Sequence, residues 1–269
     1  MPATPAPSLT TPSDFSDFKD QTMLHNTLRP TLLRLLACLM CASVAHAAPT
    51  GLLNDTGGTQ CDDGSNTMVT CTMPNTGDAA MMPRQDGRFG RDAASPTKVG
   101  GGVAGFDFTK ICMDGTLNCT GAANIGVSPA ATDWACTRDN VTNLVWSLYI
   151  AQPPTTWATA TGASYPNAGH NTVSRCGFNT GWRLPTRREL LSLVYYGAAA
   201  EPFMDTHDFP KVPFGSTGNL IDHIWTSDAY AGSSCSDCAW YVHFGDGRPV
   251  TEIKTAGTDM GVRLVRDGP

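Results

Sequence analysis

One segment of the chain predicts a sharp change from extended backbone to a capped helix: Gly181-Trp182-Arg183-Leu184-Pro185-Thr186-Arg187-Arg188-Glu189-Leu190-Leu191. Pro185 biases the residue before it away from the helical conformation. Thr186 can act as the N-cap. Glu189, three residues later, can accept a hydrogen bond from the Thr186 amide, which is the spacing of a capping box. Such a specific junction indicates one particular compact fold.

Hydrophobic residues continue at helical spacing beyond this cap. Leu190, Leu191 and Val194 would share one face, and Gly197 would stop the helix. The polar residues of the segment have structural explanations. Capping accounts for Glu189 without a catalytic role, and we expect Arg183 to form a buried structural ion pair. We expect Arg187 and Arg188 to be solvated. The segment therefore predicts a fold rather than an active site.

Residues 1–47 read as a leader with a secretory signal. Arg29 and Arg34 supply the positive region, residues 35–44 form a short apolar run, and Ala45-His46-Ala47 fits a cleavage site. The run is too short to span a bilayer. The start could be Met1 or Met23. An alternative is a lipoprotein signal ending at Cys38, although Arg34 interrupts its apolar run. We expect a secreted, periplasmic or cell-surface protein.

Cleavage after Ala47 would remove two of the ten cysteines and leave an even number. Eight cysteines in an exported chain indicate a disulfide framework. The sequence does not fix the connectivity, and our prediction is nearest-neighbour pairing. The predicted pairs are Cys61–Cys71, Cys112–Cys119, Cys136–Cys176 and Cys235–Cys238.

The remaining chain divides by composition. Residues 48–105 are rich in Gly, Thr and Asp and lack helical periodicity, so we expect an extension with one disulfide loop. Gly100-Gly101-Gly102 reads as a linker or tight turn. Residues 106–269 are expected to form the main domain. The net charge of −6 gives no basic face, which argues against a nucleic-acid partner.

Several segments of the main domain read as strands. Residues 106–111 and 144–146 carry strand patterns, as do residues 223–227, 240–244, 250–253 and 262–266. In the fourth of these, Trp240, Val242 and Phe244 alternate with Tyr241 and His243, which predicts one buried and one outward face. Strands, one clear helix and then more strands form an α+β pattern with antiparallel sheet.

These residues resemble the Lcl C-terminal domain family, named for a Legionella collagen-like surface protein. The resemblance spans about residues 106–267. It rests on Asp139-x-x-Thr142-x-Leu144-x-Trp146, on Trp182-Arg183-Leu184-Pro185-Thr186-x-x-Glu189-Leu190, and on Trp225-Thr226-Ser227 followed by Ala239-Trp240-Tyr241-Val242-x-Phe244-x-x-Gly247 and Val262-Arg263-Leu264-Val265-Arg266.

The resemblance implies a C-type-lectin-like fold, similar to that of formylglycine-generating enzymes. Such a fold is a small twisted antiparallel sheet with one or two helices and long loops. The resemblance also implies the Cys112–Cys119 and Cys136–Cys176 pairings. Residues 156–175 depart from the family, because Gly, Pro, Asn and Thr give them poor helix propensity. Only a short helix around Ala158 or Val173 is expected there.

No catalytic constellation, metal site or cofactor motif emerges from the sequence. Cys235-Ser236-Asp237-Cys238 has the spacing of a redox pair or half a zinc site, but its loop context favours a disulfide staple. Asp205, His207 and Asp208 could hold a cation, although a solvated turn fits their loop composition better.

We expect function on the outward surface of the late strands and their loops. The candidate ligand-binding residues are Asp228, Tyr230, Tyr241, His243, Asp246, Arg248 and Lys254. Aromatic residues beside Asp and Arg are typical of contact sites for sugars or proteins. The predicted function is non-catalytic binding or adhesion to an extracellular glycan or surface protein. The alternatives are an oxidoreductase that uses Cys235 and Cys238, or a structural part of a surface assembly.

Overall fold

A computed structural model describes residues 54–62, 68–71, 85–93, 96–151, 155–162, 170–171, 173–210, 213–214, 219–220, 222–257 and 260–269. The predicted signal segment, with its cleavage site and Cys38, lies outside the described residues. Within the described ranges, no helix has the length and apolar character that crossing a membrane requires.

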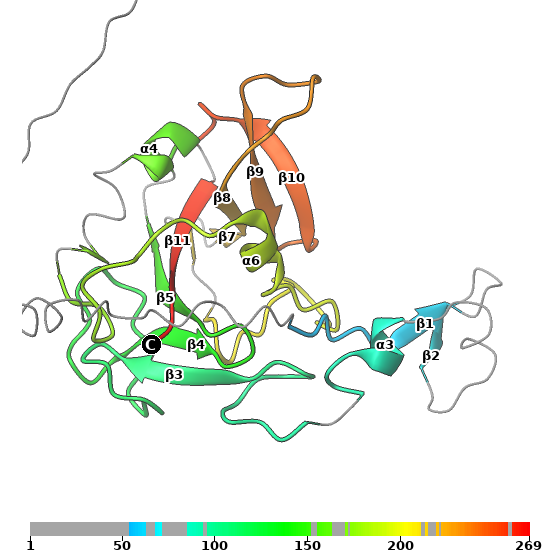
Figure 1. Cartoon of the computed structure of the whole chain (residues 1–269), viewed down its shortest axis with the longest axis horizontal. Coiled ribbons are helices and arrows are strands. Elements are labelled where there is room, and N and C mark those ends of the chain that lie inside the picture. Colours follow the sequence, from blue (N-terminus) through cyan, green and yellow to red (C-terminus); the bar gives the residue numbers. More distant parts are fainter. Residues whose placement is uncertain are drawn as a thin grey trace, which may run out of the picture. The chain divides into compact units, whose positions relative to one another are not determined.

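A mixed seven-stranded sheet forms the centre of the fold (Figure 1). Its spatial order is β10-β9-β8-β11-β5-β4-β3. The strands are β3 (Phe108–Cys112), β4 (Trp134–Asp139), β5 (Leu144–Ala151), β8 (His223–Ala229), β9 (Cys238–His243), β10 (Arg248–Ile253) and β11 (Met260–Asp267).

The pairing between β8 and β11 corrects the predicted antiparallel sheet. The last strand lies between β8 and β5, antiparallel to β5 and parallel to β8. The other neighbouring pairs are antiparallel. Strand β11 thus lies between two groups of strands that come from distant parts of the sequence, and it runs in the same direction as β8. A strand pattern in the sequence predicts that a segment is a strand, but it does not predict which strand will pair with it.

The other elements are short. They are the hairpin β1 (Gln60–Asp62) and β2 (Met68–Thr70), helix α3 (Asp86–Phe89), helix α4 (Trp157–Thr161), helix α6 (Arg187–Leu191), and the pair β6 (Pro213–Phe214) and β7 (Asn219–Leu220). Helix α4 includes Ala158, where the sequence predicts a short helix. The described residues therefore form mostly sheet with few short helices.

The capping box that begins helix α6 is present as predicted. The Thr186 side chain accepts from the Glu189 amide, and Glu189 Oε2 accepts from the Thr186 amide at 2.7 Å. The helix ends at Leu191, however, and does not reach Gly197. Beyond the helix, the backbone hydrogen-bonds to distant segments. The Tyr195 amide donates to the Phe203 carbonyl, and the Tyr196 amide donates to the Thr56 carbonyl.

Glu189 also binds Arg183, so its carboxylate is fully engaged in the junction. Arg183 donates to both Glu189 oxygens, at 2.9 and 2.7 Å, and to Asp267 at 3.2 Å. Burial opposes ionisation of Glu189, but the hydrogen bonds from Arg183 and Thr186 outweigh it and lower the pKa of Glu189. Arg183 forms the expected ion pair, but its side chain is 38% exposed and not buried as predicted.

Alternation along the strands builds two hydrophobic clusters, one on each face of the sheet. Trp146 of β5 and Val242 of β9 belong to one cluster, while Val145 and Tyr241 beside them belong to the other. Tyr241 is therefore buried, 9% exposed, with its ring edge-on to Trp225. The prediction that Tyr241 points outward is wrong, because both faces of β9 are covered at this position.

Four disulfides pair the cysteines as nearest-neighbour pairing predicts. Cys136–Cys176 connects β4 to a segment 40 residues later, and both residues are buried. Cys235–Cys238 staples the loop between β8 and β9. The first joins distant parts of the core, whereas the second constrains one loop.

Polar contacts connect the segments before β3 to the sheet. Asn54 donates to Asp139 at the end of β4. Gly101 and Phe108 exchange backbone hydrogen bonds of 2.7 and 3.0 Å, so the glycine run pairs beside β3. A side chain at Gly100 would collide with the Phe108 carbonyl, with its Cβ only 2.0 Å from that oxygen.

Candidate functional site

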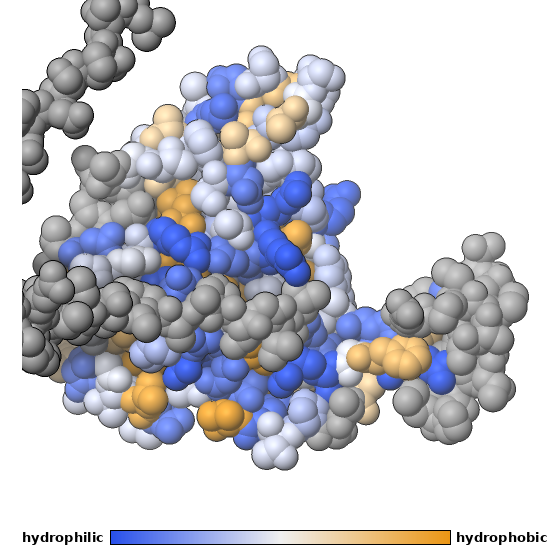
Figure 2. Space-filling view, in the orientation of Figure 1, coloured by the Kyte–Doolittle hydropathy of each residue, from blue (hydrophilic) through white to orange (hydrophobic). Residues whose placement is uncertain are grey.

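A surface hollow of about 660 Å³ lies where helix α6 meets the end of β8 and the start of β9. We call it the aromatic hollow. Helix α6 packs against β8, β9 and β10, and the β8–β9 loop projects beyond it (Figure 1). The surface over helix α6 is mostly hydrophilic (Figure 2). The residues that line the hollow are Thr186, Arg187, Arg188, Asp228, Ala229, Tyr230, Ala231, Gly232 and Trp240.

Two aromatic residues and an arginine, Tyr230, Trp240 and Arg187, help to line the hollow. The Tyr230 ring stands edge-on to Trp240, with centroids 5.5 Å apart. The Arg187 guanidinium lies 4.3 Å from the centroid of the Trp240 ring, within cation–π range. The Arg187 amide donates to the Asp228 carboxylate, which anchors the end of β8 to the start of helix α6. Hydrogen-bond donors, an acceptor and flat apolar surface therefore meet in one place.

The loop that borders the hollow is constrained by its own contacts. The Tyr230 amide donates to the Cys238 carbonyl at 2.9 Å, and its hydroxyl hydrogen-bonds the Ser234 hydroxyl at 2.8 Å. Gly232 leaves room for the phenol, because a Cβ there would lie 2.1 Å from the Tyr230 oxygen. The Cys235–Cys238 disulfide closes the same loop. These contacts hold the loop and the Tyr230 side chain in place, which reduces the entropy lost when a ligand binds.

The candidate ligand-binding residues predicted from the sequence lie at several separate locations in the structure. Asp228 and Tyr230 lie together in the aromatic hollow. Lys254 pairs with Asp237 at 3.7 Å and lies over the Trp157 ring, away from the hollow lining.

Three other candidates gather at the β9–β10 turn, at the opposite end of β9 from the hollow. Arg248 Nε donates to Asp246 Oδ2 at 2.8 Å. His243 Nδ1 lies 3.1 Å from the same Asp246 oxygen. The hydrogen bond from Arg248 is the main reason that the pKa of Asp246 falls to about 2. The Asp246 carboxylate is therefore a fixed negative charge beside the His243 ring.

The sequence reading missed three residues of the hollow. Trp240 was predicted to pack in the core, but it is only half-buried, and its ring lines the hollow. Arg187 and Arg188 were predicted to be solvated. Arg188 is exposed as predicted, although it lines the hollow, whereas Arg187 stacks on Trp240. The sequence feature that could have identified the two arginines as lining residues is their position at the N-terminus of the capped helix. Nothing in the sequence showed that this helix end faces β9.

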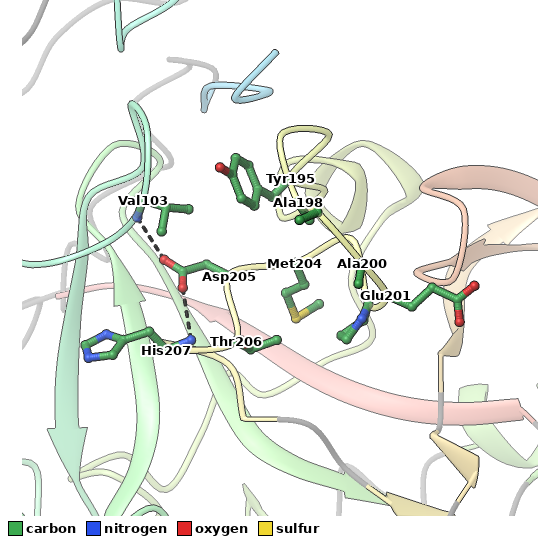
Figure 3. A pocket seen from close by; sticks show the side chains of 11 residues that line it. Val103, Tyr195, Ala198, Ala200, Glu201, Met204, Asp205, Thr206 and His207 are labelled. Carbon is green, nitrogen blue, oxygen red and sulfur yellow. Dashed lines mark hydrogen bonds between the residues drawn. The ribbon is translucent and has the colours of Figure 1, made fainter. Parts of the chain in front are cut away.

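A second hollow, of about 310 Å³, lies beside the loop after helix α6 (Figure 3). Asp205 accepts from the amides of Val103 at 2.9 Å and His207 at 3.0 Å. Asp205 and Asp208 are 4% and 1% exposed, so the prediction of a solvated turn holds only for His207. Desolvation raises the pKa of Asp208. The two carboxylates support the loop by accepting hydrogen bonds from the protein itself.

One comparison with known proteins gives a family. Residues 135–266 match the Lcl C-terminal domain. The match supports the family that the sequence motifs indicate, over a shorter span than the predicted residues 106–267. No curated protein and no solved structure gives a significant match. Residues 135–266, which match the Lcl C-terminal domain, contain helix α6, the aromatic hollow and the β9–β10 turn.

Proposed function

We propose that the protein is an exported binding or adhesion module that recognises an extracellular glycan or surface protein through the aromatic hollow. The Lcl C-terminal match supports an extracellular or surface role. Four disulfides are the usual chemistry of chains that fold in oxidising compartments. A C-type-lectin-like fold is part of the proposal, supported by the few short helices and the irregular segments around the seven-stranded sheet.

The observation that carries the proposal is the combination of Trp240, Tyr230, Arg187 and Asp228 in one preorganised hollow. Aromatic rings offer large contact area at low conformational cost, and charged groups beside them give direction through hydrogen bonds. The hollow volume of about 660 Å³ falls within the range typical of small-ligand sites. A few sugar units or a short peptide loop would fit these dimensions and this chemistry.

Binding to a glycan array and to extracellular matrix proteins tests the proposal directly. The purified full chain is compared with Trp240→Ala and Arg187→Ala. Arg187→Ala keeps the backbone amide that Asp228 accepts, so it removes only the guanidinium. We expect each variant to weaken binding by more than tenfold, as is usual for a central aromatic or arginine contact.

Arg248→Ala is the matched control, because it removes the same charge from an exposed position at the far end of β9. It should bind like the parent. Normal binding by both hollow variants would refute the aromatic hollow as the site. Loss of binding in Arg248→Ala alone would move the ligand face to the β9–β10 turn.

A further inference from the structure

We propose that Asp222, His223 and His243 form a binding site for a divalent transition-metal ion, with Zn²⁺ as the expected occupant. One ligand atom from each residue can be chosen so that all three lie within 4.8 Å of one another. The site lies at the start of β8 and the end of β9, beside the β9–β10 turn and separate from the aromatic hollow. It does not depend on the function proposed for the hollow.

The register of the sheet brings the two histidines together. His223 of β8 and His243 of β9 are directly paired across the antiparallel ladder. Residues paired in this way project to the same face of a sheet, with Cβ atoms about 5 Å apart. Their ring centroids are 4.3 Å apart. Two imidazoles on adjacent strands therefore face one small volume from fixed positions.

Asp222 supplies the third ligand from the residue before β8. Its Oδ2 lies 3.2 Å from His243 Nε2, and its Oδ1 lies 3.7 Å from His223 Nδ1. Zinc bonds of about 2.0–2.1 Å in tetrahedral geometry place neighbouring ligand atoms about 3.3–3.4 Å apart. These two separations involve different oxygens of Asp222, and with one atom taken from each residue the three ligand atoms lie within 4.8 Å of one another. Side-chain rotation that draws these three atoms together would complete the coordination.

A second carboxylate orients the His243 ring for this role. Asp246 Oδ2 lies 3.1 Å from His243 Nδ1, on the side of the ring away from Asp222. A proton on Nδ1 that is donated to Asp246 leaves the Nε2 lone pair free for the ion. Metal-binding histidines usually have such a carboxylate or carbonyl partner behind them. Arg248 fixes Asp246 in turn, through a 2.8 Å hydrogen bond.

The turn after β9 is shaped to lie closely against the cluster. A Cβ at Gly245 would come within 2.7 Å of both Asp222 Oδ2 and His243 Nε2. The Phe244 amide donates to the Asp222 carbonyl at 2.7 Å, which holds the backbone of Asp222 beside the turn. Glycine therefore permits the close approach of the turn that places Asp246 behind His243.

The donor set and its exposure indicate the kind of ion. Two imidazoles and one carboxylate suit Zn²⁺ and similar transition metals, whereas Ca²⁺ and Mg²⁺ prefer oxygen ligands alone. The side chains of Asp222, His223 and His243 are 24%, 21% and 27% exposed. Water can therefore reach the site, and a fourth coordination position would be open to water or to an oxygen of a ligand.

Titration of the untagged, chelator-treated full chain with Zn²⁺ tests the proposal by isothermal calorimetry. We expect one tightly bound ion per chain. His243→Gln and Asp222→Asn should each weaken binding by more than tenfold. Asp246→Asn should weaken it ten- to a hundredfold, because it disturbs only the orientation of His243. The matched control is His207→Gln, which removes an exposed histidine that also lies beside an aspartate.

Co²⁺ gives an independent readout, since a tetrahedral site with nitrogen ligands produces visible absorption bands. The bands should appear in the parent chain and in His207→Gln, and disappear in His243→Gln. Circular dichroism of the ion-free variants checks that each is folded, and Asp246→Asn provides a test outside the ligand set. Binding by His243→Gln at parental affinity, or no Zn²⁺ binding by the parent at micromolar concentration, overturns the proposal.

Discussion

The Cys136–Cys176 disulfide should contribute more to stability than the other disulfides of the main domain. Its cysteines are 40 residues apart, and loop-closure entropy in the unfolded chain then gives about 4 kcal/mol at 25 °C. The same relation gives about 1.6 kcal/mol for Cys235–Cys238, with a separation of 3. Removing the buried sulfurs of Cys136 and Cys176 also leaves a small cavity, which adds to the cost.

The assay is thermal and urea unfolding of three double alanine variants, one for each disulfide of the main domain, under non-reducing conditions. Loss of the Cys136–Cys176 bond should lower the melting temperature by roughly 8–16 °C, at about 2–4 °C per kcal/mol for a chain of this size. Loss of Cys235–Cys238 should have less than half that effect. Cys112–Cys119, with a separation of 7, should fall between them at about 2.4 kcal/mol. Equal or greater destabilisation by the Cys235–Cys238 variant would refute the reasoning.

Three further predictions concern single residues. Thr186→Ala should lower the free energy of unfolding by about 1 kcal/mol, because it removes the N-cap acceptor of helix α6; urea unfolding measures it. Glu189→Gln should destabilise the protein most near neutral pH. The native pKa of Glu189 is lowered, so its stabilisation is present above the unfolded pKa of about 4.5 and is lost as pH falls below it; unfolding at a series of pH values should show the two curves converging in acid. Tyr241→Ala should cost about 3–5 kcal/mol, whereas Tyr230→Ala, at a half-exposed position, should cost far less and affect ligand binding instead; paired melting and binding measurements separate the two.

Local interactions explain why parts of the fold were predictable. The capping box involves residues only three positions apart, so its hydrogen bonds follow from Thr186 and Glu189 themselves. Local strand patterns in residues 144–146, 240–244 and 262–266 predict parts of β5, β9 and β11. Nearest-neighbour pairing also gave the four disulfides, although the sequence alone left other connectivities open.

The site could be predicted only in part. Asp228 and Tyr230 were identified from their residue types, and both line the aromatic hollow. Trp240 and Arg187 were assigned other roles, because which face of a strand is covered depends on elements distant in the sequence. Tyr241 was predicted to point outward, and it is buried for the same reason. Alternation places Tyr241 and Val242 on opposite faces of β9, but it does not show that both faces are covered.

The sequence by itself determined the helix start at Thr186, the positions of most strands and the chemistry available to the late loops, because each depends on residues close along the chain. Only the tertiary structure decided that β11 pairs in parallel with β8, that Arg187 reaches Trp240, and that His223 lies opposite His243. These outcomes depend on long-range strand register and helix packing. A shift of one residue in register would turn His243 to the other face and separate the proposed ligands.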